Sequence, residues 1–75
     1  MKDEEIIALL KRDHEEFKKL DEEHRKFEAI LSEIDRKVYL TTEEEVERKK
    51  IQKLKLAGKD RMAELIREYR KGHSN

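Results

Sequence analysis

The side chains that could do chemistry are few, and most of them lie in the first half of the chain. His14 and His24 stand ten residues apart, and Asp21 precedes His24 by three residues. A carboxylate three residues from a histidine is the ligand spacing of carboxylate-bridged metal bundles. Those bundles draw ligands from several helices, however, and the second half of the chain offers no histidine within reach. We therefore interpret both histidines as packed, hydrogen-bonded side chains and predict no metal site.

No combination of residues indicates catalysis. The chain has no cysteine, no glycine-rich loop that could cradle a phosphate, and no hydroxyl residue with a base in reach. Thr41 and Thr42 are explained as helix caps, and the adjacent carboxylates Glu15 and Glu16 as a solvated surface. We predict a non-enzymatic protein with no catalytic residue and no cofactor.

A basic segment in the second half is the best candidate for a nucleic-acid surface. Residues 48–61 hold seven positive charges and one negative charge, and such a face could follow a phosphate backbone. The lysines that would do so are Lys49, Lys50, Lys53 and Lys59. No aromatic side chain is interleaved for base stacking, and acidic residues of the first half face this segment. We therefore favour a solvated, partly ion-paired helix face, with nucleic-acid binding as the alternative.

Length and composition limit the classes of protein that remain possible. The 75 residues form one domain (1–75), which is small enough to need very regular helix packing or self-association for comfortable stability. Charged residues make up 51% of the chain and its formal net charge is zero. Residues 1–40 nevertheless carry −3 and residues 41–75 carry +3. The two halves therefore complement each other when they lie side by side.

Nothing in the sequence indicates export or membrane insertion. The longest apolar run, residues 6–10, is far shorter than the roughly 20 residues that span a bilayer. The first residues are acidic, unlike those of a signal or transit peptide, and the absence of cysteine gives no sign of secretion. We expect a cytoplasmic protein with no membrane partner.

Apolar residues recur at helical spacing on both sides of a single interruption at residues 39–42. The upstream stripe predicts a helix over residues 3–38. The downstream stripe predicts a helix over residues 43–71 that ends at Gly72. Its start carries a capping box, either Thr42 with Glu45 or Thr41 with Glu44. The sequence thus predicts an all-α fold of two long antiparallel helices, a coiled-coil-like helical hairpin.

The two stripes define the expected core. With the turn near residue 41, facing residues have numbers that sum to about 82, so that Phe17 meets Leu65 and Leu31 meets Ile51. The predicted core seam consists of Phe17, Leu20, His24, Phe27, Leu31, Ile34, Ile51, Leu54, Met62, Leu65 and Tyr69.

The predicted helices differ in length, and this difference provides the leading functional hypothesis. Residue 10 pairs with residue 72, where the second helix ends, so the apolar residues at the start of the chain have no intramolecular cover. Leu56 is also expected to be exposed, because it lies on the far side of the second helix from the stripe. We predict a protein–protein interaction or self-association module, a homo-oligomer or a partner of another helical protein. The residues expected to make the contact are Ile6, Ile7, Leu9, Leu10 and Leu56.

Two segments carry spaced motifs: His14, Phe17, Leu20, His24 and Phe27 in the first, and residues 51–62 in the second. They resemble motifs of the YdcH-like proteins, a family of short bacterial proteins of unknown function. Residues 14–27 are similar to the first-helix pattern H-x-x-F-x-x-L-x-x-x-H-x-x-L on His14, Phe17, Leu20, His24 and Phe27. Residues 51–62 resemble the second-helix pattern L-K-K-x-K-L-x-L-K-D-x-I, from which Gln52 and Gly58 depart. The resemblance covers nearly the whole chain. It implies an α-helical hairpin and no activity.

Overall fold

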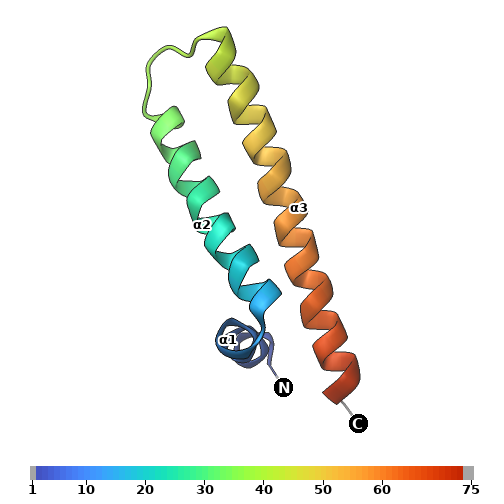
Figure 1. Ribbon diagram of the computed structural model, residues 1–75. Helices are drawn as coiled ribbons and strands as arrows, with labels where there is room; N and C mark the ends of the chain where they lie inside the picture. The colour runs from blue at the N-terminus through green and yellow to red at the C-terminus, as the bar shows by residue number, and fades with distance from the viewer. Residues whose placement is uncertain (1, 74–75) are drawn as a thin grey trace.

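Three helices make up the described part of the chain. The computed structural model describes residues 2–73 and contains α1 (Asp3–Asp13), α2 (Glu15–Asp35) and α3 (Thr42–His73), with no strand among these residues. α2 and α3 run antiparallel side by side, and α1 folds back across the open end of this hairpin (Figure 1). The molecule is 52 Å long, close to the ~48 Å expected for the 32 residues of α3. The all-α prediction is confirmed, but the two-helix hairpin is wrong, because the first predicted helix is divided into two.

His14 is the residue that divides the predicted first helix. Its backbone is extended (φ −109°, ψ 110°), while its N–H donates to the carbonyl oxygen of Leu10, 2.9 Å away, as the last bond of α1. Its side chain then caps α2, because imidazole Nδ1 accepts a hydrogen bond from the backbone N–H of Phe17 at 3.1 Å. Such a cap satisfies one of the amides that a helix start leaves without a partner. One residue therefore ends α1 and begins α2.

The charge pattern on either side of His14 favours a break at this position. Lys11 and Arg12 lie in the last turn of α1, where cations interact favourably with the helix dipole. Glu15 and Glu16 lie in the first turn of α2, where anions do so. This order of basic then acidic residues is the sequence signal for the break. This signal is easy to overlook, because histidine is not among the usual N-cap residues.

The break brings the apolar residues at the start of the chain against the core. Ile6 is 0% exposed and Leu10 is 4% exposed, and both belong to the main core cluster. Ile7 and Leu9 are half-buried. The prediction that these residues project beyond the hairpin is therefore wrong. Burying a side chain of this size contributes about 1.5–3 kcal/mol, which stabilises α1 against α2 and α3.

The connection between α2 and α3 is longer than predicted. α2 ends at Asp35 rather than at residue 38, and residues 36–41 lead into α3. Val38 and Tyr39 at this tip are each 88% exposed. Val38 therefore does not continue the apolar stripe of α2, and α2 ends before the chain reaches this exposed residue.

Both ends of α3 differ in detail from the prediction. Of the two alternative capping boxes, the one that forms is Thr41 with Glu44. The Glu44 N–H donates to Thr41 Oγ1, and the Thr41 N–H donates to a Glu44 carboxylate oxygen, both at 3.1 Å. At the other end α3 continues through Gly72 to His73, and Gly72 does not have the positive φ of a helix-ending glycine. Gly72 is therefore not the terminator that was predicted.

Most of the predicted seam lies in the core. Its buried members are Phe17, Leu31, Ile34, Ile51 and Leu65, and its half-buried members are Leu20, His24, Phe27, Met62 and Tyr69. Leu54 is 45% exposed, so its placement in the seam is wrong. At about 100° per residue, Leu54 and Met62 lie on opposite edges of the α3 stripe, and the other helices cover the edge of Met62 better.

The predicted register holds near the turn and shifts toward the open end. Lys55 pairs with Glu28 at 3.5 Å, close to the predicted alignment of the two helices. At the open end, Arg61 pairs with Glu16 at 2.8 Å. Arg61 lies closer to the turn than the residue of α3 that the prediction places opposite Glu16. The same shift brings Gly58 opposite Leu20 rather than opposite His24.

Candidate functional site

A shallow apolar groove lies between the three helices. It has a volume of about 320 Å³ and is lined by Ile7 and Lys11 of α1, Phe17, Asp21 and His24 of α2, and Lys59, Met62, Ala63 and Ile66 of α3. Ile7, Met62 and Ile66 pack against the buried cluster with one side and remain partly exposed on the other. Apolar walls with a few polar groups at this size are typical of a binding site.

Charged side chains stand around this groove. Lys11 Nζ lies 3.8 Å from Asp21 Oδ1, and the other oxygen of Asp21 lies 3.4 Å from Arg25. Lys59, by contrast, forms no hydrogen bond or ion pair with any described residue. An ammonium group that pairs with no carboxylate of residues 2–73 therefore stands at the edge of an apolar surface.

The lysines predicted to contact nucleic acid do not gather in one patch. Lys49 and Lys53 lie one turn apart and line a small hollow on the outer face of α3 together with Leu56, which is 59% exposed. Lys59 lies at the three-helix groove instead, and Lys50 lines neither place. Within residues 2–73 none of these four lysines pairs with a carboxylate. The structure thus brings together two of the four predicted residues.

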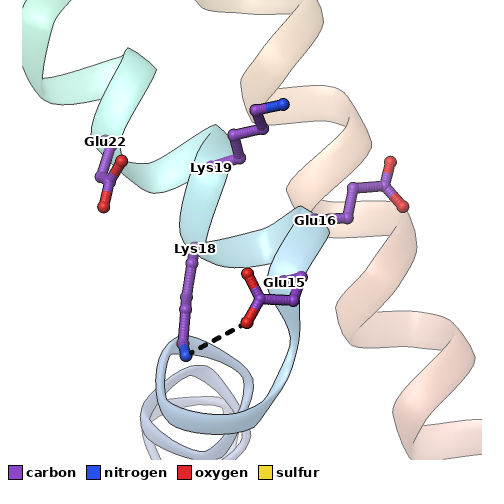
Figure 2. A pocket seen from close by; sticks show the side chains of 5 residues that line it. All are labelled: Glu15, Glu16, Lys18, Lys19 and Glu22. Carbon is purple, nitrogen blue, oxygen red and sulfur yellow. Dashed lines mark ion pairs between the residues drawn. The ribbon is translucent and has the colours of Figure 1, made fainter.

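A second hollow lies at the start of α2 and is lined only by charged residues. These are Glu15, Glu16, Lys18, Lys19 and Glu22 (Figure 2). Glu15 and Lys18 form an ion pair at 3.7 Å. No apolar residue lines this hollow, whereas ligand sites are lined mainly by hydrophobic and aromatic side chains.

Glu16 lines this hollow and is also bound by α3. Arg61 Nε lies 2.8 Å from one of its carboxylate oxygens, and Arg61 Nη2 lies 3.0 Å from the other. These hydrogen bonds lower the pKa of Glu16 and raise that of Arg61. Paired charges with this two-point geometry are directional contacts. Glu16 therefore connects α2 to α3, and the adjacent carboxylates of Glu15 and Glu16 do not act as a pair.

The two histidines have different surroundings and do not meet. His14 caps α2, whereas His24 lines the groove with its Nδ1 3.5 Å from Glu28 Oε1. No group of three or more His, Cys, Asp or Glu side chains among the described residues could hold a metal ion. The helices of this part of the chain likewise include none with the length and apolarity to cross a bilayer.

No protein-family model, curated protein or solved structure matches this chain. The resemblance to the YdcH-like proteins stays a prediction that rests on the motif residues. The structure gives physical roles to the first of them: His14 accepts from the N–H of Phe17, three residues later, and the side chain of Phe17 is buried. The spacing H-x-x-F is thus that of an N-cap followed by a core residue.

Several residues of the groove are not predicted from sequence. Ile66 follows Met62 by four residues and lies on the same helix face, so the periodicity of α3 already contained it. No periodicity in the sequence indicated that Lys11 and Asp21 lie together. They meet only because α1 folds back at His14.

Proposed function

We propose that the protein is a non-enzymatic helical interaction module that associates with a second copy of itself through the three-helix groove. One observation supports this most directly: apolar residues of all three helices form a surface that the core of the same chain leaves partly exposed. Removing such a surface from water is favourable by roughly 25 cal/mol per Å². Association with another molecule covers such a surface.

Core size and charge both favour a second copy as the partner. The described residues include only seven buried hydrophobic side chains, and domains with so small a core are often stabilised by self-association. Several charges of the two halves already pair within the chain, as in Arg61 with Glu16, but Lys59 pairs with no carboxylate of residues 2–73. Lys59 at the groove edge can then meet a carboxylate of the other copy.

A matched pair of substitutions tests the groove as the contact. Ala63 is exposed and lines the groove, whereas Ala57 is exposed on the same helix outside it. Arginine is a good helix former, so Ala63→Arg and Ala57→Arg keep the helix and add the same charge. We expect sedimentation equilibrium to show dimers for the wild type and Ala57→Arg, and monomers for Ala63→Arg. A wild type that stays monomeric at millimolar concentration contradicts the proposal, and equal association of the two variants excludes the groove.

Nucleic-acid binding is the second candidate function, supported by the lysines that lack carboxylate partners within residues 2–73. A mobility-shift assay with mixed RNA and DNA at low ionic strength should then show a complex whose affinity falls steeply with salt. The double variant Lys49→Gln, Lys53→Gln should weaken it, and Lys18→Gln, Lys19→Gln on α2 should not. Absence of any complex at low salt excludes this function.

A further inference from the structure

We propose that α1 exchanges between two copies of this chain. In the exchanged form, His14 becomes helical and α1 joins α2 in one helix over residues 3–35. Ile6 and Leu10 then pack against Phe17 and Leu65 of the other copy instead of their own. This inference goes beyond the groove contact proposed above, because it concerns a second way in which two copies of this chain can associate.

The contact that holds α1 can be made equally well by another copy. It consists of Ile6 and Leu10 packed in one cluster with Phe17 and Leu65, so it joins α1 to α2 and α3 through apolar side chains. The polar contacts at its edge, such as the ion pair of Asp3 with Arg70, also join α1 to another helix. None of these interactions depends on which molecule supplies α1.

A single residue connects α1 and α2. This residue disfavours a continuous helix only weakly. No glycine or proline occurs between residues 3 and 35, and only His14 in this range is not helical. At the break, the amides of residues 15–17 have no backbone partner, and one of them is held by the His14 imidazole. In a continuous helix these three amides would donate to the carbonyls of residues 11–13. Straightening therefore replaces one side-chain cap by three backbone hydrogen bonds.

Burial of Ile6 and Leu10 decides between the two forms. A single molecule with a straight helix exposes both side chains, so the monomer keeps α1 folded back as in Figure 1. When two molecules each have the straight helix, each can bury the Ile6 and Leu10 side chains of the other. Both molecules then retain the additional backbone hydrogen bonds. Reciprocal exchange of an identical element closes a two-fold dimer and leaves no open site. The exchanged form is therefore expected to appear as the protein concentration rises.

Substitutions at His14 test the hinge by sedimentation equilibrium. His14→Ala removes the cap and introduces the best helix former, so both hinges of the dimer favour the straight form. We expect its dimer dissociation constant to be about tenfold lower than that of the wild type. His14→Asn keeps a capping side chain and should leave the dissociation constant unchanged. Equal constants for the alanine and asparagine variants would overturn the exchange.

A crosslinking experiment identifies which molecule supplies α1. The chain has no cysteine, so Asp3→Cys and Arg70→Cys can be made as single variants, mixed, and treated with a bismaleimide. Exchange predicts covalent dimers in the mixture, more of them when His14→Ala is added to both. Dimers by sedimentation without such crosslinks overturn the exchange but leave the self-association standing. Monomers in every variant at millimolar concentration overturn both.

Discussion

Arg61 of α3 holds the carboxylate of Glu16 at two points, with distances of 2.8 and 3.0 Å. Glu16 lies in the first turn of α2, directly after the break at His14. The pair therefore fixes the start of α2 against α3 at the place where the chain changes direction. It is also a contact whose strength depends on pH.

Replacement of Glu16 by glutamine should make stability less sensitive to acid. The hydrogen bonds from Arg61 lower the pKa of Glu16 below its ordinary value of 4.5. A carboxylate with a lowered pKa stabilises the folded state above its unfolded value, and this contribution is lost as pH falls through the folded value. Urea midpoints of the wild type and Glu16→Gln should therefore differ by a constant amount from about pH 6 upward and converge below about pH 4.

Glu22 provides the control for this measurement. It lines the same charged hollow but forms no ion pair within residues 2–73. The Glu22→Gln variant should follow the wild type throughout the pH series. If Glu16→Gln also runs parallel to the wild type in acid, the contact with Arg61 does not persist in solution.

Thr41 and Thr42 should differ sharply in their response to alanine. Thr41 accepts the N–H of Glu44 in the capping box, whereas Thr42 is already the first residue of α3. Loss of an N-cap side chain costs about 0.5–2 kcal/mol, so Thr41→Ala should lower the free energy of unfolding by about 1 kcal/mol. Thr42→Ala should change it by less than about 0.5 kcal/mol. The reverse order in urea unfolding would assign the cap to Thr42.

Gly58→Ala should stabilise the protein. The glycine lies within α3, where alanine is favoured by about 1 kcal/mol, and an added Cβ would lie 3.9 Å from Cδ2 of Leu20, an ordinary contact. Thermal unfolding should shift upward by about 4–8 °C. Gly72→Ala is the control, because its added Cβ would meet no atom within 4 Å other than the neighbouring residues and the backbone of its own helix turn, and α3 ends one residue later. A larger gain at Gly72 would contradict the packing described at Gly58.

Ile6→Ala should destabilise α1 far more than Leu56→Ala affects any helix. Ile6 is fully buried, and truncation of such a side chain costs about 2–5 kcal/mol. Leu56 is largely exposed, so its truncation should cost less than about 0.5 kcal/mol. Hydrogen exchange should show loss of protection in the amides of α1 for Ile6→Ala only. Unchanged protection there would mean that α1 does not pack on the hairpin.

Local information in the sequence was sufficient for much of the fold. The apolar periodicity of α2 and α3, the acidic first turn of α3 and the alternative cap at Thr41 are all visible within a few residues. Interactions of this range act whatever surrounds them, so they could be predicted without knowing the rest of the molecule.

The direction of α1 could not be predicted in this way. Leu10 and Phe17 are seven residues apart, a spacing that keeps them on one face of a continuous helix. A break at His14 brings the same residues together in a different geometry, and the local pattern does not distinguish the two. Which of the two geometries forms depends on whether other helices cover Ile6 and Leu10.

The sequence by itself determined an all-α chain with two long amphipathic segments and one main reversal, because helical periodicity and caps are local properties. Only the tertiary structure decided that the first segment bends at His14 and that the groove forms. Leu65, which helps to cover Ile6 and Leu10, lies in the distant α3. The gain in burial from that long-range contact exceeds the small cost of interrupting the helix at one capped residue.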